Sequence, residues 1–321
     1  MAMMIIDYQH LVYKTLSPNI PVLSATVEED GIMKQVFTTI PSFTIKSVWN
    51  YSGRGSMRCA ICLEGGSATR ENHFSALGQS YKGGRKKLNP QMRKGIDLSV
   101  NLMVEGKVSC YRQAGFESDD FVYTLVQAAK QNGYTEPIYV VTNDHDLMPL
   151  VDNQVSVYMR ASRTFAIGGA PELKGYFQIT PESWDDFVLY SSRYGKNGNK
   201  GYDVPYNSVL LYKMLRGDDS DNISGLKGFG AVKYNKVIQR MRDDNVAFES
   251  IFRYENEWED IKDVIKPYFT EIEMTHMHGV YDGIRLRHTM PLDEVKLPSV
   301  IQYGLLSKAL LRYQINIAEP K

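Results

Sequence analysis

The sequence predicts an α/β fold in which a mainly parallel sheet is flanked by helices. Short apolar runs alternate with segments of helical periodicity through the first half of the chain, and this pattern is typical of a parallel sheet covered on both faces. Acidic residues follow three of these runs. Ligands of such sheets bind beyond the carboxyl ends of the strands. We therefore expect the acidic residues to share one edge of the sheet.

The first half of the chain supplies the expected sheet and its covering helices. The firmest helix is 118–132, whose apolar residues have helical spacing and which Ser118 or Asp119 can cap. Pro41 is expected to break a partly helical stretch at 26–50, and residues 64–95 are interpreted as a mobile basic excursion. The remaining elements are strands at 3–6, 58–63, 108–112, 138–142 and 155–159 and helices at 9–14, 97–104 and 146–150.

A helical region is expected after residue 180. Thr180-Pro181-Glu182 combines a capping residue with a proline in the first turn, which is typical of a helix start. The last helix is amphipathic and is expected to pack on its own domain; the alternative is that it docks a partner such as a single-strand-binding protein. The helices of this region are expected at 206–216, 230–241, 258–268 and 302–313.

The composition excludes several classes of protein. Hydrophobic residues make up 43% and charged residues 23% of the 321 residues, as in ordinary globular proteins. No apolar run approaches the roughly 20 residues of a membrane span, and Asp7 follows the N-terminus too soon for a signal peptide. We therefore expect an intracellular, cytoplasmic protein. Three cysteines argue against a disulfide framework, and Cys59 and Cys62 are interpreted as buried thiols rather than zinc ligands.

The formal net charge is zero, yet basic residues are concentrated in one segment. Nine Lys and Arg residues and only three acidic residues lie between Arg70 and Arg112, an excess that can bind a polyanion. Within it, Tyr81 precedes a run of basic residues. A solvated charge run is the ordinary explanation. The functional one is that Lys82 and Arg85 neutralise a phosphate while Tyr81 stacks on a terminal base.

Nine acidic residues in five short clusters are the strongest chemical signal in the chain. Two unit charges 4 Å apart repel by roughly 4 kcal/mol near a protein surface, so carboxylates gathered at one edge call for a cation. An all-oxygen ligand set favours Mg²⁺ or Mn²⁺ and hence phosphate chemistry. The residues are Asp7, Glu64, Glu117, Asp119, Asp120, Asp144, Asp146, Asp218 and Asp221.

Some of these clusters have simpler explanations when taken alone. Surface loops often supply pairs such as Asp144 and Asp146, and acids at 117–120 complement a helix dipole. The segment 217–230 is the densest signal, because its two acids would lie side by side on a helical turn and its glycines precede a helix. Such glycines and helix-start N–H groups suit a DNA backbone, although a plain turn is the alternative. The glycines are Gly225, Gly228 and Gly230, and the helix carries Lys233 and Lys236.

Taken in order, these motifs resemble those of the 5′–3′ exonuclease and flap endonuclease family over about residues 3–300. Two departures are Glu64, where the family usually has Asp, and Ser224, where it usually has Pro. Residues 71–80 also form a longer segment than in the polymerase-linked relatives. The matching segments are Met4-Ile5-Ile6-Asp7, Cys62-Leu63-Glu64, Arg70 with Tyr81-Lys82 and Arg85, Glu117-Ser118-Asp119-Asp120, Thr142-Asn143-Asp144-His145-Asp146-Leu147 and 217–230.

The resemblance implies a PIN-like, mainly parallel sheet in a catalytic domain at 1–180, with a helical arch at about 70–113. A helical DNA-binding region would follow at 181–321, with a helix–hairpin–helix motif at about 217–238. The implied activity is that of a structure-specific 5′ nuclease on 5′ ends or flaps of DNA, and on RNA in RNA–DNA hybrids. Its implied role is to remove primers or flaps in replication.

The resemblance also implies roles for individual residues. Two Mg²⁺ or Mn²⁺ ions would align water and the scissile phosphate, with Lys82, Arg85, Asp120 and Asp144 at the reaction itself. K⁺ would bind at the glycine hairpin. The first ion would be held by Asp7, Glu64, Glu117, Asp119 and Asp120, and the second by Asp144, Asp146, Asp218 and Asp221. DNA would contact Arg70, Tyr81, Lys82, Arg85, Lys86, Lys87, Gly225, Gly228, Gly230, Lys233 and Lys236.

Two other classes of protein fit the same motifs. One is a branched-DNA-binding homologue that has lost catalysis, and Glu64 in place of the usual Asp is compatible with this class. The other is a PIN-type ribonuclease, against which the glycine hairpin and the long second half argue. No polymerase-like segment follows in the chain, so we expect a stand-alone, bacteriophage-type enzyme, monomeric and located in the host cytoplasm.

Overall fold

The computed structural model describes residues 1–15, 23–84, 90–160, 173, 175–195 and 201–315. At its centre is a six-stranded sheet in the order β5-β4-β1-β6-β7-β8. Strands β7 and β8 are antiparallel and the other neighbouring pairs are parallel, which confirms the predicted mainly parallel sheet. The strands are β1 Met3–Asp7, β4 Arg58–Cys62, β5 Ser109–Tyr111, β6 Ile138–Val141, β7 Val155–Arg160 and β8 Tyr176–Ile179.

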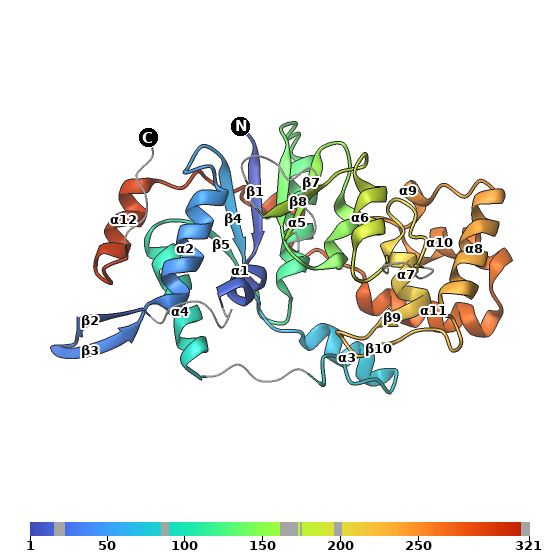
Figure 1. Ribbon diagram of the computed structural model, residues 1–321, viewed down its shortest axis with the longest axis horizontal. Helices are drawn as coiled ribbons and strands as arrows, with labels where there is room; N and C mark the ends of the chain where they lie inside the picture. Colours follow the sequence, from blue (N-terminus) through green and yellow to red (C-terminus); the bar gives the residue numbers. More distant parts are fainter. Residues whose placement is uncertain (16–22, 85–89, 161–172, 174, 196–200, 316–321) are drawn as a thin grey trace.

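Alternate side chains of the central strand enter two different apolar cores. Met3 and Ile5 pack into one buried cluster, and Met4 and Ile6 into the other, because successive side chains of a strand point to opposite faces. Helix α5 covers the first face, and α1, α2, α4 and α12 cover the second (Figure 1). These helices are α1 Tyr8–Thr15, α2 Thr39–Tyr51, α4 Pro90–Glu105, α5 Ser118–Gln131 and α12 Tyr303–Leu311.

The second half of the chain forms a helical region beside the sheet (Figure 1). The first apolar core continues from the sheet into these helices, so the domain boundary at residue 180 stays a prediction. Helix α12 returns to the other end of the molecule, where the Tyr303 and Trp49 rings lie 5.4 Å apart. The elements are α6 Trp184–Tyr190, α7 Val209–Arg216, β9 Gly217–Asp218, β10 Ile223–Ser224, α8 Ala231–Asp243, α9 Phe248–Ile251, α10 Trp258–Ile265, η2 Lys266–Tyr268, α11 Glu271–Ile284 and η3 Leu292–Glu294.

A β-hairpin forms the first part of the stretch 26–50, which we predicted to be partly helical, and a helix forms the rest. Strands β2 Ser24–Glu29 and β3 Ile32–Phe37 are joined by Asp30 and Gly31, both with positive φ. An Asp-Gly pair of this kind forms the tight turn that joins antiparallel strands. Pro41 does not break the following helix, because it lies in the first turn of α2, where a backbone N–H has no intrahelical partner.

Several predicted helix boundaries were also wrong. Residues 64–95 are not an irregular excursion throughout, since they contain α3 Ala68–Ala76 and the beginning of α4. Helix α5 is capped by Glu117, whose side chain forms a reciprocal capping box with Asp120. Helix α6 begins after Ser183 rather than at Thr180. Helix α11 and the antiparallel strand β8 were not predicted.

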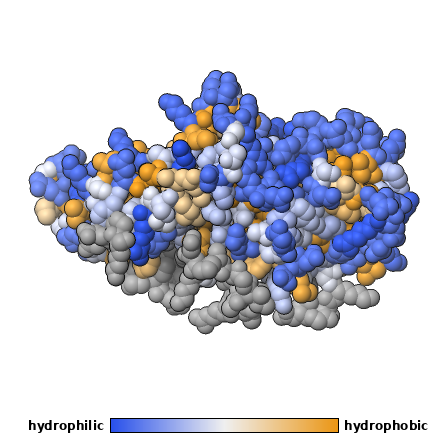
Figure 2. All heavy atoms as spheres, turned by 90° about the horizontal axis from the view of Figure 1, so that it is seen from above, coloured by the Kyte–Doolittle hydropathy of each residue, from blue (hydrophilic) through white to orange (hydrophobic). Residues whose placement is uncertain are grey.

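The surface shown in Figure 2 is largely hydrophilic, with hydrophobic residues in small groups. Among the described helices, none combines the length and the apolar character needed to cross a bilayer. Cys59 and Cys62 are buried free thiols, as predicted.

The register of the sheet determines where the acidic residues emerge. Ile6 of β1 pairs with Ile61 of β4 on one side and with Val141 of β6 on the other. These three parallel strands therefore end at the same edge. Asp7, Glu64 and Asp144 follow these positions along the chain, and this edge carries the candidate site.

Candidate metal centre

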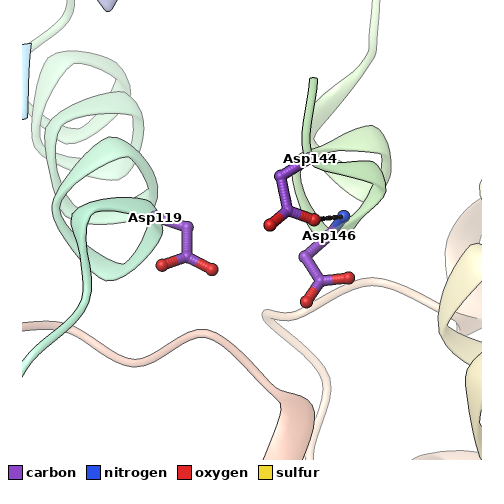
Figure 3. Close-up of side chains that lie close together, drawn as sticks. All are labelled: Asp119, Asp144 and Asp146. Carbon is purple, nitrogen blue, oxygen red and sulfur yellow. Dashed lines mark hydrogen bonds between the residues drawn. The ribbon is translucent and has the colours of Figure 1, made fainter. Parts of the chain in front are cut away.

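Three carboxylates face one another at the carboxyl edge of the sheet (Figure 3). Asp119 lies in the first turn of α5, while Asp144 and Asp146 belong to the loop after β6 and the 3-10 helix η1 His145–Leu150. One oxygen from each lies within 4.8 Å of the others. Asp144 is oriented by accepting a hydrogen bond of 2.9 Å from the backbone N–H of Asp146. This all-oxygen set is of the kind that Mg²⁺ and Mn²⁺ prefer.

The electrostatics of Asp119 fit a bound cation. Its carboxyl is buried, and burial, together with the charges of Glu117 and Asp120, raises its pKa well above the usual range despite the nearby Arg70. A carboxylate in such a place is stabilised when a divalent ion binds beside it. The residues of this cluster therefore fit the metal that the acid pattern predicted.

Asp7 is the buried end of the central strand and joins the cluster to the sheet. It accepts hydrogen bonds from the hydroxyls of Ser118 (3.0 Å) and Thr142 (2.9 Å). Burial raises its pKa to about 6, and the charge of Asp144 acts in the same direction. Asp7 thus holds α5 and the β6 loop in place while keeping a carboxylate near Asp144.

Glu64 lies at the margin of the same edge and is partly exposed. The backbone N–H of Ser118 donates a 3.4 Å hydrogen bond to its side chain. Burial, and then the charge of Glu117, raises the pKa of Glu64 to about 6. The charge of Glu117 therefore acts on the Glu64 carboxyl. Direct binding of metal by Glu64 stays a prediction.

We expected Arg70 to contact a phosphate, but its side chain points into the protein. Its guanidinium is buried and forms ion pairs with Glu117, with Asp120 at 3.0 Å and with Asp119 at 3.5 Å. The expected phosphate contact is therefore not supported. Arg70 instead neutralises the acidic start of α5, because three carboxylates in four positions exceed what the helix dipole can stabilise.

Glu117 and Asp120 are likewise engaged within the protein rather than turned toward Asp144. The pKa of Glu117 lies below its usual value because the attraction of Arg70 and Lys82 outweighs burial. Asp120 accepts hydrogen bonds from the backbone N–H groups of Glu117 and Arg287, each at 3.2 Å. Of the expected ligands on α5, Asp119 is the one whose carboxylate groups with the β6 loop.

Tyr81 and Lys82 pack against the same acids. The Tyr81 ring stacks on Phe74 with centroids 5.3 Å apart, and its hydroxyl donates to Glu117 (3.1 Å) and Asp221 (3.2 Å). A ring buried in this way is not free to stack on a base, which corrects that expectation. Lys82 forms an ion pair with Glu117 and remains partly exposed at the rim of the site.

Asp218 and Asp221 do not lie side by side on a helical turn. Asp218 is the last residue of β9 and Asp221 lies in the turn that joins β9 to β10, and their side chains have different partners. Asp218 faces Lys213 (2.6 Å) and Arg193 (3.3 Å), whereas Asp221 faces Tyr81. Despite burial, the two cations hold the pKa of Asp218 far below its usual range.

Two cations of this site, Lys213 and Arg193, were missed in the sequence. Lys213 also forms an ion pair with Asp146, so it links the β6 loop to the β9–β10 turn. A lysine inside the apolar segment 209–215, five residues before Asp218, was the signal available for it. No comparable pattern marks Arg193.

The glycine segment lies between helices α7 and α8, as the motif predicted. A side chain at Gly225 would collide with the backbone of Arg216, and Gly228 has φ +76°, so both positions require glycine. Lys236 is exposed on α8, while Lys233 pairs with Glu273 at 3.0 Å. Gly230 caps the helix. The DNA and K⁺ roles of these residues stay predictions.

The structure thus brings Asp7, Asp119, Asp144 and Asp146 to one place and connects Asp218 to them through Lys213. The remaining predicted DNA contacts Arg85, Lys86 and Lys87 lie outside the described residues.

A parallel sheet with this carboxyl edge and a glycine hairpin between helices defines a PIN-like α/β protein with an acidic centre able to hold a divalent cation. Residues 2–174 match the family model of the 5′–3′ exonuclease N-terminal, resolvase-like domain. The chain belongs to this family.

Curated relatives share part of their length with this chain. DNA polymerase I of Bacillus subtilis is 25% identical over 173 residues, which cover 54% of this chain and 17% of the polymerase. The 5′–3′ exonuclease of Mycoplasma pneumoniae is 30% identical over 158 residues, or 49% of this chain and 46% of that protein. The chain thus matches less than half the length of either relative.

Solved structures show the same fold over nearly the whole chain. A flap endonuclease of bacteriophage T5, in a complex with DNA and metal ions, superposes with a TM-score of 0.54 at 14% identity, covering 97% of this chain and 93% of that one. A T5 5′-exonuclease with bound zinc superposes with a TM-score of 0.53 at 16% identity, covering 88% and 86%.

Proposed function

We propose that this chain is a divalent-metal-dependent 5′ nuclease that hydrolyses phosphodiester bonds at 5′ ends or flaps. The observation that carries the proposal is the cluster of Asp119, Asp144 and Asp146, whose oxygens lie within 4.8 Å of one another in a chain of the 5′–3′ exonuclease family. The T5 proteins of the same fold bind DNA and metal ions, which supports the same ligands here.

We propose two Mg²⁺ or Mn²⁺ ions, with Asp7, Asp119 and Asp144 holding the first and Asp146 and Asp218 contributing to the second. When bound, the ions would activate water and neutralise charge on the scissile phosphate. The buried hydroxyls of Ser118 and Thr142 keep Asp7 oriented. Burial limits the access of bulk water to Asp7, Asp119, Asp146 and Asp218, whereas Asp144 is exposed.

The basic residues of the arch would complete the site. Lys82 is 17% exposed at the rim, so its ammonium can turn from Glu117 toward a phosphate, and Arg85 would act beside it. Lys236 and the turn at Gly225, Gly228 and Gly230 would hold the duplex by its backbone, with K⁺ on the turn. These contacts position the substrate without reading its sequence.

The proposed substrates are flapped, branched or 5′-ended DNA and RNA in RNA–DNA hybrids. Removal of primers or flaps in replication is the role that such substrates imply. We propose that the protein acts as a monomer inside the cell. Helix α12 exposes Leu305 and Leu311, so it offers a contact to a single-strand-binding protein while packing on its own fold.

A 5′-labelled flap and a matched RNA–DNA hybrid test the proposal directly. Cleavage of either substrate in Mg²⁺, abolished by EDTA, supports it. A second candidate is a non-catalytic branched-DNA-binding protein, favoured by Arg70 and Lys213, which already neutralise several of the acids without a metal. Tight flap binding without cleavage at any Mg²⁺ or Mn²⁺ concentration would replace the nuclease by this candidate. Cleavage of single-stranded RNA alone would point to a PIN-type ribonuclease.

A further inference from the structure

Lys213 is a buried lysine in a site made of acids. Its side chain extends from α7 and is 3% exposed, and its neighbours in the helix are buried apolar residues such as Leu211 and Met214. A buried ammonium is costly unless it is paired. Lys213 therefore has to be explained by the groups that it contacts.

The Lys213 ammonium forms ion pairs with two carboxylates from separate clusters. The Nζ atom lies 2.6 Å from Oδ2 of Asp218 and forms a second ion pair with Oδ1 of Asp146. Asp218 is the last residue of β9 and Asp146 lies in η1, and the two are 72 positions apart in the sequence. Lys213 thus stands between them as a positive charge.

Asp146 is shared between this lysine and the candidate metal cluster. One of its oxygens groups with Asp119 and Asp144, while Lys213 draws the same carboxylate toward Asp218. Arg193 contributes a second cation to Asp218 at 3.3 Å and is less buried than Lys213. Asp144 has no ion pair with a basic residue in the described part of the chain. Arg70 also approaches Asp119, at 3.5 Å, but its shorter ion pairs are with Glu117 and Asp120. Lys213 is therefore the cation in closest contact with the cluster.

We propose that Lys213 is an internal counter-cation that occupies the second metal position of this site. It neutralises Asp146 and Asp218 when that position holds no ion, and its ammonium has to withdraw before a second divalent ion can bind there. The inference rests on the proposed two-ion function. It implies unequal affinities: the first ion binds between Asp119 and Asp144, and the second binds more weakly because it competes with Lys213.

Mn²⁺ titration of the metal-free, full-length protein tests the proposal, with bound ion measured by calorimetry and by electron paramagnetic resonance. Wild-type protein should bind two ions in separate phases. Lys213→Met removes the competing charge at similar volume, so the second dissociation constant should fall by about tenfold or more, as expected when a unit charge leaves hydrogen-bond distance. The first should change less than about twofold.

Lys130→Met is the matched control. Lys130 pairs with an aspartate outside the site, Asp152 at 2.6 Å, and it contacts none of the site acids in the described structure. It should leave both dissociation constants unchanged. A folded Lys213→Met protein whose second affinity is unchanged or weaker would overturn the proposal, because Lys213 would then support the metal rather than compete with it.

Asp218→Asn provides a second test if Lys213→Met does not fold. It removes one of the two carboxylates that Lys213 bridges, so the second Mn²⁺ should be lost while the first is retained. Retention of both ions with unchanged affinity would contradict the inference. Failure of the proposed function is a separate result: absence of flap cleavage with the expected Mn²⁺ shifts would refute the nuclease and leave the role of Lys213 intact.

Discussion

The backbone N–H of Ser224 donates a hydrogen bond of 3.0 Å to the side-chain oxygen of Gln79. A second bond in the same place runs from the backbone N–H of Lys82 to the carbonyl of Asp221, at 2.9 Å. These bonds fasten the glycine hairpin to the segment that carries Lys82. The bonds thus fix the position of the hairpin, which is expected to bind DNA, relative to Lys82, which is expected to face the phosphate.

We predict that Gln79→Ala and Ser224→Pro each lower the free energy of unfolding by about 0.5–1 kcal/mol, since each removes one partner of a single exposed hydrogen bond. The free energy of unfolding of the double variant should be only slightly lower than that of either single variant, because both substitutions remove the same hydrogen bond. Urea unfolding measures all three. Fully additive losses would show that the two residues act independently. The N–H of Ser224 makes this bond possible, and a proline at position 224 has no N–H to donate.

Asp144→Asn should abolish Mg²⁺-dependent flap cleavage, because it removes a charge from the cluster where cations are expected to bind. Binding of the same flap in Ca²⁺ should remain within a few-fold of wild type, since the basic surfaces are unchanged. Asp293→Asn, at an exposed position in η3, is the control and should cleave normally. Full activity of Asp144→Asn would refute the metal assignment.

Lys82→Ala should lower kcat by about 100-fold, with KM changed only several-fold, because a charge aimed at the reacting phosphate acts mainly in the transition state. Lys236→Ala, on the exposed face of α8, should do the reverse and raise KM. Single-turnover and steady-state assays on one flap substrate separate the two effects. A change in KM alone for Lys82→Ala would place this lysine in binding.

The sheet and the positions of its acids were predictable because both depend on local pattern. Apolar runs such as 3–6 and 138–142 read as buried strands, and parallel strands bring their carboxyl ends to one edge. That reasoning placed Asp7 and Asp144 together correctly. It also found helix α5, whose apolar residues recur at helical spacing.

The partners of those acids were not predictable, because they depend on side-chain orientation. Arg70 was expected to face a phosphate, yet it is buried among Glu117, Asp119 and Asp120. Sequence spacing does not show whether a basic residue points outward or into an acidic core. Lys213 illustrates the same limit, since it approaches Asp146 only after the β6 loop and α7 have packed together.

In the metal-free protein, the titration of Asp7 should lower the free energy of unfolding as pH rises from about 4 to 6. Burial raises its folded-state pKa from 3.8 to about 6, so the folded state keeps a proton that the unfolded state has lost, and the free energy of unfolding decreases over this window. The loss attributable to Asp7 is at most on the order of 3 kcal/mol. Asp7→Asn should remove it. Urea unfolding in EDTA at both ends of the window gives the difference; an identical pH dependence in both proteins would contradict it.

Arg70→Met should destabilise the metal-free protein by about 3–5 kcal/mol, because it leaves buried carboxylates without their counter-cation. Arg70→Lys should lower the free energy of unfolding by less, because it keeps the positive charge. Some loss should remain, because a lysine cannot reach Glu117 and Asp120 with two nitrogens at once. Arg285→Met is the matched control: Arg285 pairs with the largely exposed Glu257, and an exposed pair is worth about 1 kcal/mol or less. Urea unfolding in EDTA ranks the three variants. Equal losses for Arg70→Met and Arg285→Met would mean that the acids at the start of α5 are already protonated in the folded protein, and Arg70 would then not be the cation that holds them together.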